Sequence, residues 1–335
     1  MRIGFTYNLR EDHPQLAAGP ADVAADWDLA EPMQELREGI ARVGHQVVDI
    51  GDPRALLEHD FDVDLIFNIA EMTGFRFREA LAPALCELLG LPYTFSTADV
   101  MVTSLDKNVS NLLVRQAGGA VADWAIAWRS DDAQLLRALD ERPGARWIVK
   151  PVAEGSSMGI SRSSVCDSAA AVREQVDRAV ATYGEPALVQ RFLAGRELTV
   201  GVVERDGRPH ALAPMEVELR GELFDFTSKE ALGAEVVRNL AVDRSDPLYE
   251  PARAIAALAF EVIGCRDVAR VDLRCAQGSE ELSFLEINAL PGLDPLSAET
   301  FAIDYDELLA TIIASACRRY GWDRAGATAS GSPST

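Results

Sequence analysis

The segment KPVAEGSSMGIS (residues 150–161) places a lysine directly before a loop rich in glycine and serine. The lysine ends an expected strand, RWIVK (146–150), and the backbone N–H groups of such a loop are suited to wrap a phosphate. The loop is not of the Walker A type, because there the lysine follows the glycines. A Gly/Ser loop alone is more often a simple turn between strands, so the lysine is the informative residue.

Lysine is rare in this chain. Only Lys107, Lys150 and Lys229 occur, so 29 of the 32 basic residues are arginine. Codon bias accounts for the overall ratio but not for the places where the three lysines stand. A slim ammonium on a flexible stem suits a phosphate contact that the wide, planar guanidinium does not reproduce. The three positions therefore indicate a shared anionic ligand.

The composition excludes several classes of partner. A formal charge of −21 argues against nucleic acid or an anionic membrane, because both require a basic surface. Apolar stretches such as DLIFNIA are shorter than the roughly 20 residues that span a bilayer. The chain starts directly in a strand-like run, and its five cysteines are scattered without CxxC spacing. These features predict a cytoplasmic protein with reduced thiols.

Strand and helix patterns alternate over residues 1–100, which predicts a small parallel α/β domain. The expected strands are RIGFTY (2–7), HQVVDI (45–50) and VDLIFNI (63–69), and the expected helices are 30–44 and 77–90. After a short bridge (91–106), residues 101–186 form a second unit with helices at about 106–116, 131–141 and 167–183 and strands at DWAIAW and RWIVK.

From residue 187 the pattern changes to closely spaced strands. Expected strands are ALVQRF, ELTVGVVERDG, RPHALAPMEVEL, VARVDLRC and ELSFLEIN, covered by helices at about 247–263 and 304–319. Their short turns, such as RDGR, predict a mostly antiparallel sheet in a third domain, 187–324. Residues 325–335 are small and polar, and we expect them to be disordered.

Two strands near the C-terminal end carry oxygen ligands. Alternation in ARVDLR puts Arg270, Asp272 and Arg274 on one face, and alternation in SFLEIN puts Phe284, Glu286 and Asn288 on one face. If the strands pair as a hairpin, Asp272, Glu286 and Asn288 converge. Three oxygen ligands without His or Cys are what Mg²⁺ prefers. The alternative is a polar sheet face exposed to water.

The segment LVQRFLAGREL (188–198) is a third candidate feature. An apolar strand leads into QRFL, where backbone that leaves sheet geometry exposes groups able to read the edge of an adenine. Glu197, a few residues on, is placed to hold ribose hydroxyls. A simple interdomain linker is the plainer interpretation of this segment alone. Together with the loop and the carboxylates, it points to a nucleoside triphosphate with Mg²⁺.

These motifs together resemble the D-alanine–D-alanine ligase family of the ATP-grasp superfamily. The motifs that carry the resemblance are LGLPYTFSTADVMVTSLDK (89–107), KPVAEGSSMGIS, LVQRFLAGREL, ARVDLR and FLEINALPGL (284–293). The resemblance implies a three-domain α/β ATP-grasp fold: a Rossmann-like N-terminal domain, a central lid domain, and a C-terminal domain with ATP bound between the last two. It also implies a homodimer formed through the N-terminal domain.

The resemblance implies roles for individual residues. The residues expected to bind ATP are Lys107, Lys150, Glu154, Ser156, Ser157, Gln190, Arg191, Phe192, Leu193, Glu197 and Lys229. The expected metal ligands are Asp272, Glu286 and Asn288, and the expected cofactors are ATP and two Mg²⁺ ions, for which Mn²⁺ can substitute. The expected catalytic residues are Arg270, Lys229 and Ser156. The expected substrate contacts are Glu71, Glu230, Arg270, Gly292 and Ser297.

The implied reaction is ATP-dependent amide formation between a carboxylate and an amine through an acyl phosphate. The amino-acid side of the motif set departs from the family. FTYNLREDHPQ replaces the Gly-rich turn with its Ser–Glu pair, Glu230 stands where Tyr is usual, and NIAEMTGFRFRE replaces a His–Gly turn with Glu71, Arg76 and Arg78. Gln190 also stands where Glu is frequent, but an amide can still accept from the adenine amino group.

We therefore expect a ligase that joins an amino acid or small peptide other than two D-alanines, in specialised metabolism. Two alternatives remain open: a D-alanine–D-alanine ligase of cell-wall synthesis with substitute residues, and a non-catalytic ATP-binding protein. A Rossmann dehydrogenase is disfavoured, because RIGFTYN opens no G-x-G-x-x-G motif.

Overall fold

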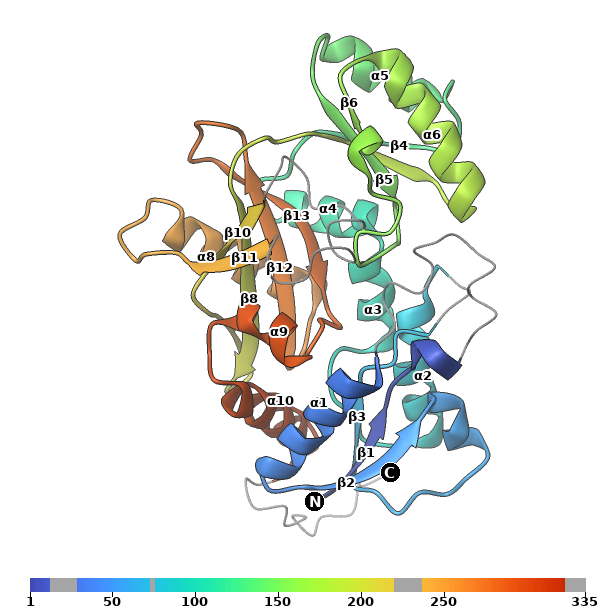
Figure 1. The fold of residues 1–335 in the computed structure, drawn as a ribbon, viewed down its shortest axis with the longest axis vertical. Helices are drawn as coiled ribbons and strands as arrows, with labels where there is room; N and C mark the ends of the chain where they lie inside the picture. The colour runs from blue at the N-terminus through green and yellow to red at the C-terminus, as the bar shows by residue number, and fades with distance from the viewer. Residues whose placement is uncertain (13–28, 73–75, 220–236, 323–335) are drawn as a thin grey trace.

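The computed structural model describes residues 1–12, 29–72, 76–219 and 237–322. Within these ranges the chain forms three sheets, each covered by helices, and the three parts surround a common centre (Figure 1). The tail at 325–335, predicted to be disordered, lies outside the described residues. The three-sheet architecture is the predicted one.

The N-terminal sheet is parallel, as its alternating pattern predicted. Its strands are β1 (Arg2–Thr6), β2 (Gln46–Gly51) and β3 (Leu65–Asn68), in the order β2-β1-β3, with helices α1 (Ala30–Arg42) and α2 (Leu81–Leu89) and short 3-10 turns η1 (Arg10–Asp12), η3 (Pro53–Leu57) and η4 (Arg78–Ala80). Apolar side chains of β1 and β3, such as Phe5 and Phe67, are fully buried. Gly90 ends α2 in the left-handed conformation.

The bridge at 91–106 contains a helix that the sequence interpretation missed. Residues Ala98–Leu105 form α3, which begins after Thr97, and Lys107–Gln116 form α4. The Asp106 carboxylate caps α4 by accepting from the backbone N–H groups of Asn108 (3.0 Å) and Val109 (3.1 Å). This cap makes Lys107 the first residue of α4, where its side chain is buried.

The central sheet is antiparallel and has two different faces. Its strands are β4 (Trp124–Ala127), β5 (Trp147–Pro151), β6 (Val165–Cys166) and β7 (Ala187–Arg191), in the order β4-β7-β5-β6, with helices α5 (Ala133–Glu141) and α6 (Ala169–Tyr183) and the turn η5 (Arg162–Ser164). Trp147, Val149 and Val189 pack against α5 and α6 on one face. Alternation therefore places Lys150 and Gln190 together on the opposite face.

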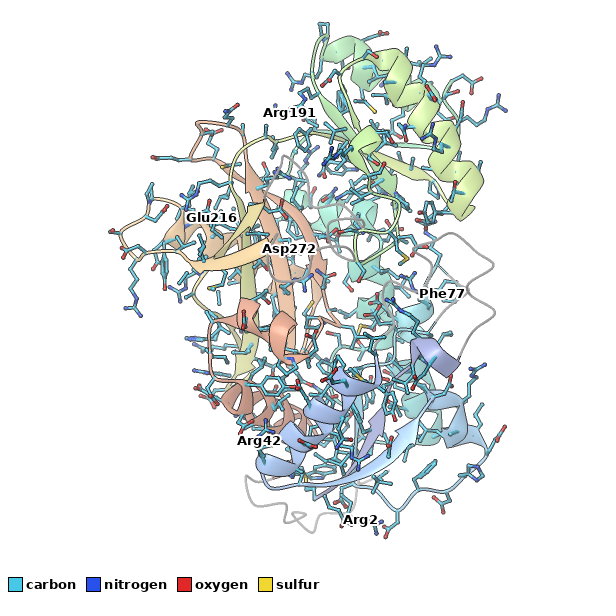
Figure 2. All side chains as sticks on the ribbon, viewed as in Figure 1. Arg2, Arg42, Phe77, Arg191, Glu216 and Asp272 are labelled. Carbon is cyan, nitrogen blue, oxygen red and sulfur yellow. The ribbon has the colours of Figure 1, made fainter. Side chains whose placement is uncertain are left out.

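The predicted boundary before residue 187 falls just ahead of β7. Because β7 pairs with β4 and β5, the central sheet continues to Arg191, and the chain enters the C-terminal sheet only after that residue. Arg191 lies where the two sheets are joined (Figure 2).

The C-terminal sheet is antiparallel throughout. Its main path is β11 (Val237–Ala241), β10 (Met215–Leu219), β8 (Glu197–Arg205), β12 (Val268–Cys275) and β13 (Leu282–Asn288), and β9 (Arg208–Ala211) pairs with β8. The predicted single strand over 208–219 is two strands, because the chain breaks before Met215 at Pro214, which has no N–H to donate. Its helices are α8 (Tyr249–Ile263), α9 (Pro295–Ala298) and α10 (Tyr305–Arg319), with the turn η7 (Glu299–Phe301).

A β-bulge in β13 corrects the predicted facing of Phe284. Asp272 pairs with Glu286, but the next residue, Leu273, pairs with Phe284, so Leu285 is an extra residue in β13. The bulge turns Phe284 to the core, where it is fully buried, while Glu286 stays on the other face. Leu285 is half-buried and is not part of the core cluster.

A buried ion pair fixes the N-terminal region against the C-terminal domain. Asp267 is fully buried and contacts Arg319 of α10, with Nη1 and Oδ1 2.7 Å apart. The Asp267 carboxylate also accepts from the Phe95 N–H (2.7 Å), and Arg319 donates to the Tyr93 carbonyl (2.7 Å). The bonds to Phe95 and Tyr93 are what cross between the two domains; an exposed ion pair, Arg42 of α1 with Asp306 of α10, joins the domains directly at 2.8 Å.

The predictions of no membrane span and of reduced thiols concern features that the structure describes. Among the described residues, no helix is both long and apolar enough to cross a membrane. All five cysteines are buried free thiols.

Candidate active site

The predicted hairpin forms and brings the three oxygen ligands together. Across β12 and β13, Asp272 lies opposite Glu286 and Arg270 lies opposite Asn288. Asn288 Nδ2 donates to Asp272 Oδ2 (3.3 Å), and Arg270 Nε lies 3.4 Å from Asp272 Oδ1. Asp272 lies near the middle of the molecule (Figure 2), on β12, which runs between β8 and β13 in the C-terminal sheet.

Two of the three lysines converge on Glu286. Lys107 Nζ lies 3.4 Å and Lys150 Nζ 3.9 Å from Glu286 Oε2. Burial acts to raise the pKa of Glu286, but the two lysines and Arg270 outweigh it and lower that pKa to about 2. Burial also lowers the pKa of Lys150 to about 8, against the attraction of Glu286. The site therefore holds ionised carboxylate next to strong positive charge.

The phosphate loop, defined here as Glu154–Gly159, has an unusual backbone. Ser156 (φ 45°) and Ser157 (φ 61°) are both left-handed, which costs a non-glycine residue about 1–2 kcal/mol. The two serines are the central residues of a tight turn closed by the Met158 N–H, which donates to the Gly155 carbonyl (2.8 Å). Backbone N–H groups in turns can form a concave surface that binds anions. Lys107 Nζ donates to the Glu154 carbonyl, so the loop begins beside the two lysines.

Buried polar atoms without partners lie on the inner faces of both sheets. Gln190 is 1% exposed, and neither its amide oxygen nor its amide nitrogen has a hydrogen-bond partner among the described residues. The Thr199 hydroxyl, on β8 opposite Asp272, is also buried without a hydrogen-bond partner among the described residues. A buried amide without a partner is costly, so the Gln190 position fits a bound base.

Arg274 is a site residue to which the sequence interpretation gave no role. It lies opposite Glu197 across β8 and β12, with Nη1 2.9 Å from Glu197 Oε2. Its guanidinium also lies 5.0 Å from the centre of the Phe192 ring, which Arg146 approaches at 4.9 Å. Alternation along ARVDLR had placed Arg274 on this face. A cavity of about 620 Å³ borders Glu197 and Arg274.

Glu71, Arg76 and Arg78 lie near different parts of the candidate site. Burial acts to lower the pKa of Arg270, but Asp272, Glu286 and then Glu71 raise it, so Glu71 lies within electrostatic reach of Arg270. Arg76 instead pairs with Asp106, the cap of α4. Arg78 is buried and pairs with Glu154 of the phosphate loop.

Some expected site residues cannot be placed. Lys229 and Glu230 lie outside the described residues. Ser297 falls in α9, but its side chain is not described, and Gly292 is exposed in the turn that follows β13.

The donor set fits Mg²⁺ and ATP. No group of three or more His, Cys, Asp or Glu side chains in the described ranges is arranged to hold a metal by itself. Asp272, Glu286 and Asn288 offer two carboxylates and an amide, a hard oxygen set suited to an ion that takes its other ligands from phosphate and water. The unpartnered Gln190 amide and the lysines fit the two ends of a nucleotide.

The two facing sheets, with a lysine-lined anion site between them, define an ATP-grasp ligase. The family profile described as "D-ala D-ala ligase C-terminus" matches residues 113–314. The chain belongs to the D-alanine–D-alanine ligase family.

Relatives match over most of the chain. The D-alanine–D-alanine ligase of Gluconobacter oxydans is 29% identical over 293 residues, covering 84% of this chain and 92% of that protein. The ATP complex of the Bacillus anthracis D-alanine–D-alanine ligase superposes with a TM-score of 0.72 at 21% identity, covering 96% of this chain and 98% of the other. The VanG D-Ala:D-Ser ligase of Enterococcus faecalis superposes with a TM-score of 0.69 at 17% identity, covering 94% and 99%.

Proposed function

We propose that this protein is an ATP-dependent ligase that activates D-alanine as an acyl phosphate and joins it to a second D-alanine. The observation that carries this proposal is the convergence of Lys107, Lys150 and Arg270 on the Asp272–Glu286 pair. Family membership and the relatives named above favour D-alanine over the different substrate that the sequence departures suggested.

In this proposal the chain's own residues position the ATP phosphates and neutralise the negative charge of the reaction. Lys107 and Lys150 hold the terminal phosphates, and the left-handed backbone at Ser156 and Ser157 supplies N–H donors above them. When bound at Asp272, Glu286 and Asn288, Mg²⁺ supplies neutralisation of phosphate charge. The carboxylate of the first amino acid attacks the γ-phosphorus, the bond to the bridging oxygen breaks, and ADP leaves. The neutral amine of the second amino acid then attacks the carbonyl carbon of the acyl phosphate, which releases phosphate and forms the amide. Arg270 stabilises the negative charge that develops on the carbonyl oxygen in the tetrahedral intermediate.

Glu71 is proposed to bind the ammonium of the first amino acid. It lies in the field of Arg270, at the N-terminal side of the same centre. The backbone next to it is fixed, because the Met72 N–H donates to Asn8 Oδ1 at 2.8 Å. In this arrangement Glu71 holds the ammonium of the first amino acid, and the carboxylate of the same amino acid faces Arg270.

A second candidate is ligation of a different amino-acid pair. It is favoured by two departures in the sequence: Glu71 lies in the segment that replaces the family's His–Gly turn, and Glu230 stands in place of Tyr. An acceptor with a basic side chain is the class that extra carboxylates would select.

A product-resolved assay tests the proposal. ADP release is measured with D-alanine alone, L-alanine alone and D-alanine paired with other D- and L-amino acids, and products are identified by mass spectrometry. D-alanyl-D-alanine as the major product supports the proposal. ADP release only with another pair replaces it with the second candidate, and ATP binding without substrate-dependent ADP release indicates a non-catalytic protein.

A further inference from the structure

The start of the phosphate loop is held from three directions. Val152 and Ala153, which lead into the loop, are fully buried. The Lys107 N–H at the start of α4 donates to the Val152 carbonyl (3.0 Å), and the Ala153 N–H donates to Glu185 Oε1 (3.0 Å). The third contact comes from Arg78, which belongs to the N-terminal domain.

Arg78 reaches the loop at two points. Its Nη2 lies 3.0 Å from Glu154 Oε2, and its Nη1 donates to the Ala153 carbonyl at 3.3 Å. The Arg78 side chain is 6% exposed and that of Glu154 is 19% exposed, so the pair is shielded from solvent. A guanidinium that binds a carboxylate and a carbonyl at once fixes orientation as well as distance.

The same loop residue is tied to the metal ligands. The Glu154 carbonyl accepts from Lys107 Nζ, and Lys107 pairs with Glu286. Contacts therefore run without interruption from Arg78, through Glu154 and Lys107, to Glu286. Arg76 adds a parallel link, because it pairs with the Asp106 cap of the helix that begins at Lys107.

We propose that Arg78 is a positioning residue, by which the N-terminal domain sets the phosphate loop over ATP. This inference rests on the proposed function for its context, because Glu71, the proposed ammonium ligand, lies in the same 71–78 segment. In this inference Arg78 acts through its contacts with Glu154 and the Ala153 carbonyl. Its contacts hold Glu154, and through Glu154 the backbone of Ser156 and Ser157, at the distance that phosphate binding requires.

The test measures nucleotide binding and loop protection without any amino acid. Calorimetry gives the Kd for Mg²⁺ with the non-hydrolysable analogue AMP-PNP in wild type, Arg78→Glu, Arg78→Lys, Glu154→Arg and the double variant Arg78→Glu/Glu154→Arg. Breaking a buried charge pair at one partner is expected to raise the Kd at least about tenfold. It is also expected to speed backbone hydrogen exchange over 153–160. The exchanged pair should recover most of both losses, and Arg78→Lys should recover part.

Arg42→Glu is the matched control, because Arg42 also bridges the N-terminal domain to the rest of the molecule. That pair is exposed, so the control is expected to keep the wild-type Kd within about twofold. Thermal unfolding shows whether each variant folds. If Arg78→Glu or Glu154→Arg does not fold, Glu154→Gln replaces it, because this variant keeps the shape of the Glu154 side chain and removes its charge.

The outcomes separate this inference from the proposed function. If wild type binds AMP-PNP and folded Arg78→Glu binds it equally well, Arg78 has no positioning role. If Arg78→Glu weakens binding but the exchanged pair recovers nothing, the contact to Glu154 is not the cause, which also overturns the inference. If wild type does not bind AMP-PNP, the proposed function fails first. A different ligation product leaves this result unaffected.

Discussion

The two lysines that the structure describes, Lys107 and Lys150, show how a rare residue type can mark a site. Among the described residues the chain uses arginine for its structural pairs, such as Arg319 with Asp267 and Arg78 with Glu154. Lys107 and Lys150 both face Glu286, where a phosphate group is expected. At this position the compact ammonium leaves room for a ligand that a guanidinium would displace.

Replacing Lys150 tests whether this position requires lysine and not arginine. Lys150→Ala should lower kcat about 100- to 1,000-fold, the loss usual for a charge-stabilising donor, while the fold is kept. Lys150→Arg keeps the charge and is the control for charge alone. Steady-state ADP release and the far-UV spectrum are compared across the three proteins. Wild-type turnover in Lys150→Arg would show that the slim ammonium is not required.

At the scale of elements, the phosphate loop depends on glycine at its end. Gly159 has φ 73°, and an added Cβ would lie 2.5 Å from Pro151 Cγ and 3.0 Å from Tyr183 Cε2. Ala therefore meets both a strained backbone and two rigid neighbours, Pro151 on the strand that carries Lys150 and Tyr183 at the end of α6.

Gly159→Ala should reduce kcat/KM for ATP about 100-fold, because displacement of the loop by about 1 Å misplaces its donors. Gly207→Ala is the matched control: its φ is 71°, and an added Cβ there has nothing within 4 Å. Both variants are expected to lose about 1 kcal/mol of unfolding free energy from the backbone alone. Activity loss of equal size in both would point to general destabilisation instead of loop displacement. Urea unfolding and ATP kinetics measure the two effects.

Local patterns predicted most of the elements and the convergence of the three residues expected to bind the metal. Alternation in ARVDLR and SFLEIN was sufficient to place Asp272, Glu286 and Asn288 together, because pairing follows strand geometry. It was insufficient for Phe284, because a bulge resets alternation and leaves no clear mark in one sequence. Arg78 was unpredictable in a different way: its partner is 76 positions away, and only tertiary packing brings the two together.

At the scale of the whole molecule, buried charge at Asp267, just before β12, joins the N-terminal and C-terminal parts. Asp267→Asn would leave Arg319 without its partner in a buried setting, and such a loss typically costs about 3–5 kcal/mol. Asp206→Asn removes a comparable pair, with Arg318, at the surface, where the expected cost is below about 1 kcal/mol. Urea unfolding of both variants gives the difference. Equal and small costs would show that the Asp267 pair does not hold the domains together.

The stability of the whole chain should also respond to pH through His45. Burial lowers its pKa below the ordinary 6.5, and its Nδ1 is buried without a hydrogen-bond partner among the described residues. The unfolded chain therefore binds the proton more readily, so the free energy of unfolding should fall as pH drops below about 6.5. His45→Gln should flatten this part of the curve, whereas exposed His59→Gln should not. Unfolding measured from pH 7.5 to 5 makes the comparison.

The bulge at Leu285 has a consequence for how this strand can change. Without Leu285, β13 would alternate strictly, and Phe284, Glu286, Ile287 and Asn288 would each keep the face they now have. The extra residue is therefore dispensable for both the core and the metal ligands. What it adds is one apolar side chain outside the core, immediately before Glu286. Deleting Leu285 would therefore restore strict alternation in β13 and remove one half-buried apolar side chain next to Glu286, while the core residues and the expected metal ligands keep their faces.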